Sequence, residues 1–138
     1  TIDKSIFIDS IKISCIKVNH ATIFVFEENN KKVIYAPCDV KPLPNDDIFN
    51  NADVLIIGST IVGNVLKGGF VLKDDNPLRN DFFTMDEIED IKRKYNISKV
   101  VITHLEEDWG KSYNDYLKLE CQYNGIQFAY DGMEIDVK

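Results

Sequence analysis

Three short apolar runs, rich in β-branched residues, most strongly restrict what this chain can fold into. They lie at residues 32–36, 53–58 and 99–103, and each has the length of a strand rather than of a helix. The residues inside 53–58 are all apolar, which is typical of a central strand covered on both faces. The sequence therefore predicts strands at all three runs, with residues 53–58 as a central strand of the sheet.

Other segments complete the expected secondary structure. Alternating or apolar residues predict strands at 6–8 and 11–18, and the polar turn at 28–31 makes residues 22–27 and 32–36 a hairpin. Thr84 with Glu87, and Ser112 with Asp115, have the spacing of capping boxes that open helices. The further expected features are a short helix at 46–51, an end to the last helix at Asn124-Gly125, and a closing hairpin of residues 127–130 and 133–137 around Asp131-Gly132.

Residues 59–83 have no clear periodicity, and a segment of this length is typical of a functional loop rather than of a linker. Around it, the chain is rich in strands first, and strands and helices alternate afterwards. We therefore expect a single α/β domain over residues 1–138, with one mixed β-sheet and helices on one face.

The net charge, the hydropathy and the cysteines indicate which classes of partner and which cellular compartment to expect. The net charge of −7 argues against nucleic acid as a partner, since proteins that bind its backbone need a concentrated basic face. No apolar stretch approaches the roughly 18 residues of a membrane span, so no membrane contact is expected. The three cysteines are odd in number and widely spaced, which is typical of reduced thiols and predicts a cytoplasmic protein.

Three side chains that can bind metals stand where apolar runs stop. Asp39 follows residues 32–36, His104 follows 99–103, and His20 follows 11–18. Because buried strands deliver their last residues to the rim of a sheet, we expect all three at one edge, where α/β proteins usually build sites. Imidazole and carboxylate groups are ligands that suit zinc. The alternative is structural, because hydrogen-bonded histidines after strands and aspartates in turns are both common.

The segments that carry these residues resemble the metallo-β-lactamase superfamily, and within it the carbon–phosphorus lyase accessory phosphodiesterases. The resemblance runs from His20 to the C-terminus and corresponds to the second half of that family. The matching segments are Val18-Asn-His20, Lys32-Val-Ile-Tyr-Ala-Pro-Cys-Asp39, Ala52-Asp-Val-Leu-Ile-Ile57, the capped helix from Thr84, Val100-Val-Ile-Thr-His104 and Phe128-Ala-Tyr-Asp-Gly-Met-Glu134.

This resemblance implies a fold, a reaction and a set of ligands. The fold would be half of an αββα sandwich, and the reaction would be attack of metal-activated hydroxide on a phosphodiester or a related small phosphate ester. His20 would bind a first metal, Asp39 would bridge two metals and His104 would bind the second, with zinc or manganese as the ions of the complete enzyme. Asp81 is the candidate proton carrier, because it stands near the place of a histidine that some relatives carry.

The chain departs from the family in one large respect. The family's H-x-H-x-D-H loop supplies most of the metal ligands, and this chain has only two histidines in all. We therefore expect the C-terminal half of a longer hydrolase, inactive and without metal on its own, that self-associates through an uncovered apolar sheet face. Two alternatives stay open. One is a non-catalytic binding or scaffolding domain that kept the fold and lost the metals, and the other is a mononuclear site made by His20, Asp39 and His104.

Overall fold

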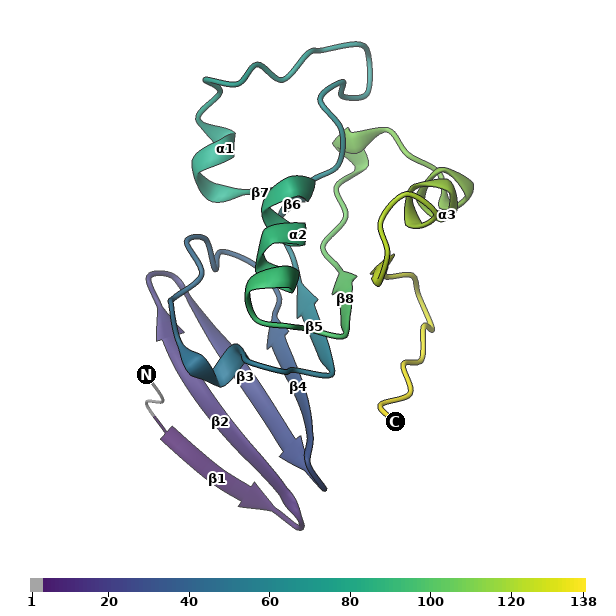
Figure 1. The fold of residues 1–138 in the computed structure, drawn as a ribbon. Coiled ribbons are helices and arrows are strands. Elements are labelled where there is room, and N and C mark those ends of the chain that lie inside the picture. The colour runs from purple at the N-terminus through teal and green to yellow at the C-terminus, as the bar shows by residue number, and fades with distance from the viewer. Residues whose placement is uncertain (1–3) are drawn as a thin grey trace.

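The computed structural model describes residues 4–138 and contains one large sheet with helices beside it (Figure 1). The strands of this sheet follow the order β1-β2-β3-β4-β5-β8-β9. Neighbours from β1 to β4 are antiparallel, whereas β4, β5, β8 and β9 run parallel. The predicted mixed sheet is confirmed. Its strands are β1 (Lys4–Ile8), β2 (Ile11–Val18), β3 (Ala21–Glu28), β4 (Lys31–Ala36), β5 (Val54–Ile57), β8 (Lys99–Ile102) and β9 (Ile126–Phe128).

The three apolar runs become β4, β5 and β8, which are adjacent in the sheet. Strand β5 lies between the other two, and all of its residues except Ile56 are buried. A continuous apolar run suits this place, because a central strand has a neighbour on each side and a packed layer over its faces.

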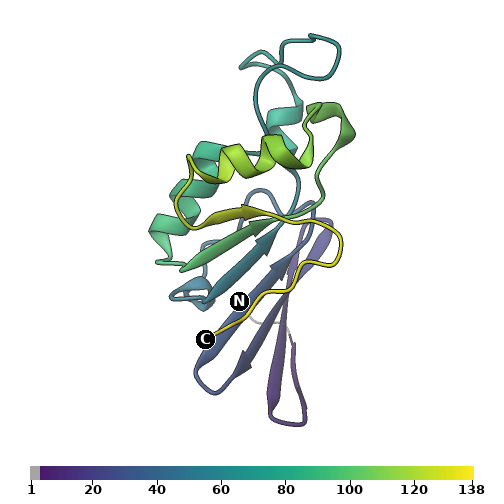
Figure 2. The same cartoon turned by 90° about the vertical axis from the view of Figure 1, so that its right-hand side faces the viewer.

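The helices begin where the sequence places their caps. Thr84 Oγ1 accepts a hydrogen bond from the backbone N–H of Glu87 at 3.2 Å, and Glu87 Oε1 accepts one from the backbone of Thr84 at 3.0 Å. Ser112 and Asp115 form the same reciprocal pair, so both predicted capping boxes are confirmed. Figure 2 shows α2 and α3 on the same side of the sheet. The helical segments are η1 (Asp47–Phe49), α1 (Leu78–Asp81), α2 (Met85–Lys94), η2 (Glu107–Trp109) and α3 (Tyr113–Glu120).

The two faces of the sheet are covered to different extents. The face toward the helices, here called the helix face, presents buried residues from β2 to β9 that join Phe49, Ile88 and Tyr95 in one core. Alternate residues of the same strands point to the other side, here called the open face. The core residues of the helix face are Ile16, Ile23, Val25, Ile34, Ala36, Leu55, Ile57, Val100, Ile102, Ile126 and Phe128.

The expected closing hairpin is wrong. Met133 N donates to Tyr130 O at 3.0 Å and Gly132 has a φ of 81°, so the turn exists, but residues 133–137 form no strand. Strand β9 instead pairs in parallel with β8. That position buries Ile126 and Phe128 in the core, which a free hairpin would leave exposed.

The structure differs from expectation in two other places, the end of the last helix and the segment 59–83. Helix α3 ends at Glu120, before the predicted end at Asn124-Gly125, and turns fill the interval. The segment 59–83 is not a bare loop, since it contains α1 and the strand β6 (Thr60–Ile61), which pairs with β7 (Phe83–Thr84). Within residues 4–138 no helix combines the length and the apolar character needed to cross a bilayer.

The capping box of α2 predicts a pH-dependent stability. Burial works to raise the pKa of Glu87, but hydrogen bonds from Lys41 and from the Thr84 backbone outweigh it and hold this pKa below its ordinary value of 4.5. Ionised Glu87 therefore stabilises the protein above pH 4.5, and this stabilisation is lost as the pH falls through the lowered pKa. We expect Glu87→Gln to lower the melting temperature at about pH 7 and to have little effect at about pH 3, as measured by circular dichroism.

The same substitution at Glu89 is the control for this experiment. Glu89 lies on α2, and its side chain is not among the hydrogen-bond partners of Lys41. Equal pH dependence of the two variants would show that the bond between Lys41 and Glu87 is not the cause.

Candidate functional site

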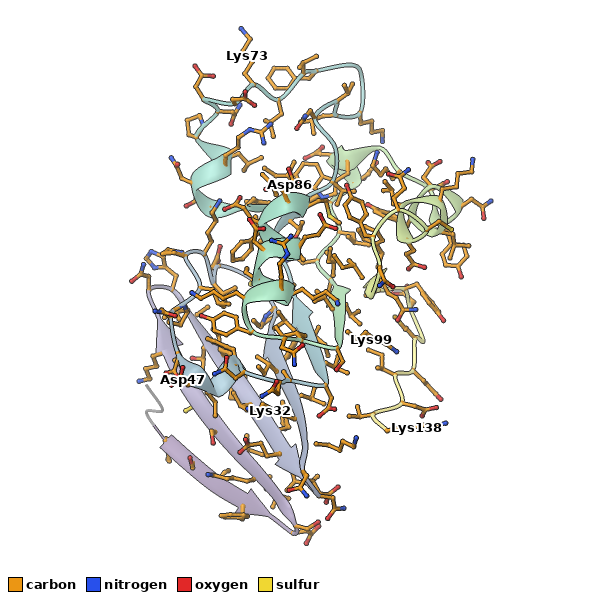
Figure 3. All side chains as sticks on the ribbon, viewed as in Figure 1. Lys32, Asp47, Lys73, Asp86, Lys99 and Lys138 are labelled. Carbon is orange, nitrogen blue, oxygen red and sulfur yellow. The ribbon has the colours of Figure 1, made fainter. Side chains whose placement is uncertain are left out.

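The carboxyl ends of β4, β5 and β8 form one edge of the sheet, here called the site edge. Their last residues, Ala36, Ile57 and Ile102, are paired in register across the three strands. Figure 3 shows Lys32 and Lys99, near the starts of β4 and β8, at the opposite edge. The chain leaves the site edge toward Asp39 after β4 and toward His104 after β8, so both residues follow the edge at which parallel sheets usually build sites.

Gly58 holds these two segments close together. Its N–H donates to Ala36 O at 3.0 Å. A Cβ added to Gly58 would lie 1.5 Å from Pro37 O and 3.2 Å from His104 Cβ. The chain that leads from β4 to Asp39 and the side chain of His104 therefore flank the same glycine, and only a residue without a side chain fits between them.

His20 lies in the turn between β2 and β3, at the same edge. Strand β3 is antiparallel to β4, and Phe24 is the partner of Tyr35. Each step back along β3 is a step forward along β4, so the turn that contains His20 lies toward the end of β4 from which the chain continues to Asp39. The side chains of both residues are exposed to solvent. The topology thus brings all three predicted ligands to the site edge, while their role in binding metal stays a prediction.

Three residues just after these strands have left-handed backbone conformations. The φ angles are 54° at Asp39, 56° at Ser59 and 55° at His104. Such a conformation is costly for residues other than glycine, and it clusters at functional sites when the surrounding structure enforces it. Each strand of the parallel set β4, β5 and β8 thus ends in the same kind of strained turn at the site edge.

Ser59 is the member of this set that the sequence analysis missed. Ser59 follows an apolar run just as Asp39 and His104 do, but its hydroxyl is not a typical metal ligand and the segment 59–83 that it opens has no periodicity. Ser59 is 3% exposed, and its backbone carbonyl accepts a hydrogen bond from Phe83 N at 2.9 Å. This hydrogen bond lies next to the β6–β7 pairing, and α2 begins directly after β7. Ser59 therefore connects the site edge to the capped start of α2.

The imidazole of His104 is paired with a carboxylate. His104 Nε2 lies 3.2 Å from Glu106 Oε1, and the His104 side chain is about half exposed. Carboxylates next to ligating histidines commonly fix the orientation of the ring. Because Nε2 is directed at Glu106, Nδ1 is the nitrogen of His104 that would be available to bind a metal ion.

Lys41 joins the Asp39 segment to α1 and α2. Its ammonium donates to Arg79 O at 2.6 Å, to Phe82 O at 3.1 Å and to Glu87 Oε1 at 2.9 Å, and the side chain is 16% exposed. Asp81, the predicted proton carrier, is an exposed residue at the end of α1 between these two carbonyls. Lys41 therefore holds the backbone on both sides of Asp81 near the segment after β4, and the proton-transfer role of Asp81 stays a prediction.

The residues at the site edge do not amount to a metal centre by themselves. Nowhere in residues 4–138 do three histidine, cysteine, aspartate or glutamate side chains lie close enough together to hold a metal ion. A di-metal centre needs several nitrogen and oxygen ligands around each ion and a bridging carboxylate. The chain supplies at most part of that set.

Known structures with the same arrangement identify the fold. A diphosphatase of the PhnP family superposes with a TM-score of 0.63 at 18% identity, over 94% of this chain and 44% of its own. Zinc-bound PqqB from Methylobacterium extorquens gives 0.66 at 15% identity, over 99% and 50%, and the metallo-β-lactamase fold protein YhfI from Bacillus subtilis gives 0.64 at 15%, over 95% and 52%. This chain has half of the metallo-β-lactamase fold. No family model and no curated protein matches its sequence.

The chain corresponds to only part of each matched structure, and this limits what can be concluded about its function. The chain spans about half the length of the metallo-β-lactamase fold structures that it matches. The fold predicted from the sequence is confirmed as half of the metallo-β-lactamase fold. One of the matched structures, PqqB, contains zinc. At 15% to 18% sequence identity, these similarities show the fold of the chain and do not show its activity.

Proposed function

We propose that this chain is the C-terminal half of a metal-dependent hydrolase that acts on a phosphodiester or a related phosphate ester. The main support is the geometry around Gly58, which sets His104 beside the segment that leads to Asp39 at the site edge. The name of one neighbour, a diphosphatase, favours phosphate compounds as the substrate class. His20, Asp39 and His104 would contribute to a zinc or manganese centre whose other ligands come from an H-x-H-x-D-H loop.

The chain on its own is expected to be inactive. No trio of ligands stands together within the described part of the chain, so we assign no catalytic step to this chain alone. Its contribution to the proposed enzyme is to position Asp39 and His104 through the strained turns after β4 and β8.

The test compares this chain with the product of the complete open reading frame that encodes it, purified with zinc or manganese. We expect the complete product to contain metal and to hydrolyse bis(p-nitrophenyl) phosphate, whereas residues 1–138 alone do neither. In the complete product, Asp39→Asn should lower kcat/KM by about 100-fold or more, because asparagine tolerates the left-handed backbone but lacks the charge that bridges two cations.

Asp47→Asn is the matched control. Asp47 is exposed and lies in η1, away from the site edge in Figure 3, so this substitution should leave kcat/KM unchanged. A complete product without metal, or one that hydrolyses the ester equally well with Asp39→Asn, would overturn the proposal.

A non-catalytic binding or scaffolding domain is the second candidate. One observation favours it: within residues 4–138 no three histidine, cysteine, aspartate or glutamate side chains lie close enough together to hold a metal ion. An encoding gene without an H-x-H-x-D-H loop upstream, together with a metal-free complete product, would support this candidate over the hydrolase.

A further inference from the structure

Residues 133–137, here called the C-terminal segment, have the pattern of a strand although they form none. Apolar and acidic side chains alternate along the segment, and their exposure alternates with them. The apolar residues are half-buried, whereas the acidic ones are exposed. Such an alternation with a period of two indicates an extended chain with one face packed against a layer of protein. The apolar residues are Met133, Ile135 and Val137, and the acidic ones are Glu134 and Asp136.

The backbone of the C-terminal segment is almost entirely without partners in the described chain. Met133 N donates to Tyr130 O in the preceding turn, but no backbone hydrogen bond joins residues 134–138 to any other part of residues 4–138. Each of these five residues carries a backbone N–H and a backbone C=O. An extended segment with unpaired N–H and C=O groups is a template for pairing with another strand.

The C-terminal segment lies over the open face of the sheet. Val137 lines a hollow together with Phe26 and Val33, whose side chains point to that face. Val54 and Val101 also point to the open face, yet they are only 3% and 1% exposed. Figure 2 shows the chain running back from β9 across the strands. The segment therefore has the position of a strand in a second layer over the open face.

The rest of this second layer is missing from the described chain. On the open face of β1, β3 and β4, Ile6 is 47% exposed, Phe24 40% and Tyr35 37%. The matched structures superpose on 94% to 99% of this chain but on only 44% to 52% of their own length, so each of them contains a further half. An apolar sheet face that continues beside the C-terminal segment is what a second sheet would cover.

We propose that the C-terminal segment is a strand of the other half's sheet, and that it pairs by backbone hydrogen bonds with an edge strand of that half. Its apolar side chains stay directed at the open face, and its acidic side chains face away. The partner strand alternates in the same way, with polar or basic residues beside Glu134 and Asp136. This inference rests on the proposed function only in that a further half of the fold exists, and not on metal binding or hydrolysis.

Amide hydrogen exchange, measured by NMR on residues 1–138 and on the product of the complete open reading frame, tests the pairing. We expect fast exchange of the amides of residues 134–137 in the short chain. In the complete product, at least two of them should exchange about 100-fold more slowly or less. Asn124 is the internal reference, because it is exposed between α3 and β9 and its N–H donates no backbone hydrogen bond within the described chain. Its exchange rate should be the same in both proteins.

Three outcomes would overturn this inference. They are fast exchange of residues 134–137 in the complete product, a complete product that contains no other half, and slow exchange in the short chain that increases with protein concentration. The last outcome would assign the pairing to a second copy of this chain. By contrast, slow exchange in a complete product that lacks metal and activity would support the pairing and contradict only the proposed hydrolase.

Proline substitutions test the same hydrogen bonds through stability, because proline has no N–H to donate. Glu134→Pro, Ile135→Pro, Asp136→Pro and Val137→Pro are each compared with alanine at the same position. In the complete product, proline should lower the melting temperature by about 3 °C more than alanine does, at two alternate positions or more. In residues 1–138 alone, proline and alanine should have equal effects at all four positions. Equal effects in the complete product as well would contradict the pairing.

Discussion

Gly58→Ala is expected to destabilise the protein by about 3 kcal/mol or more. The added Cβ would lie 1.5 Å from Pro37 O, a backbone atom that cannot move aside as a flexible side chain does. Relief requires β4 and β5 to separate at the site edge, at the point where Gly58 N donates to Ala36 O. The loss should appear as a lower midpoint in urea denaturation, with the circular dichroism of the variant recorded in parallel.

Gly68→Ala separates this steric effect from the general cost of replacing glycine. Gly68 has a φ of 86° and open space around its Cβ position, so its replacement costs only the backbone strain, about 1–2 kcal/mol. A loss at Gly58 no greater than at Gly68 would contradict the close approach of Pro37 and His104 at the site edge.

Lys41→Met is expected to cost about 2–3 kcal/mol and to loosen the segment that contains Asp81. The variant keeps most of the apolar stem but leaves the carbonyls of Arg79 and Phe82 and the carboxylate of Glu87 without their cation. Urea denaturation measures the loss of stability. Limited proteolysis should show faster cleavage within residues 59–83.

Lys67→Met is the control for this substitution. Lys67 also forms an ion pair, with Glu107, but the side chains are 60% and 85% exposed. Exposed pairs contribute little, so the change in stability should stay below about 1 kcal/mol. If the two variants lose the same stability, Lys41 does not join the Asp39 segment to α1 and α2 as the hydrogen bonds indicate.

The candidate site shows where reasoning from sequence succeeds. Asp39 and His104 were found because a buried strand ends at a predictable edge, and the structure places the segments that carry them on either side of Gly58. Ser59 was missed although the same signal precedes it, because a serine carries no metal-binding group and the segment after it has no periodicity. The hydrogen bonds of Lys41 join residues far apart in the chain, and no local pattern marks such contacts.

The sequence by itself determined the local elements, because their signals act over a few residues. The apolar runs of β4, β5 and β8 and the capping boxes at Thr84 and Ser112 specify strand and helix starts without any other part of the chain. Only the tertiary structure decided that β9 pairs with β8, that Val137 lies beside Phe26 and Val33, and which apolar residues of the open face stay exposed. These are Ile6, Ile8, Phe24 and Tyr35. These outcomes depend on which distant strand has a free edge and on how much apolar area is buried when a segment pairs there. The alternation of apolar and polar residues along one segment predicts neither of these.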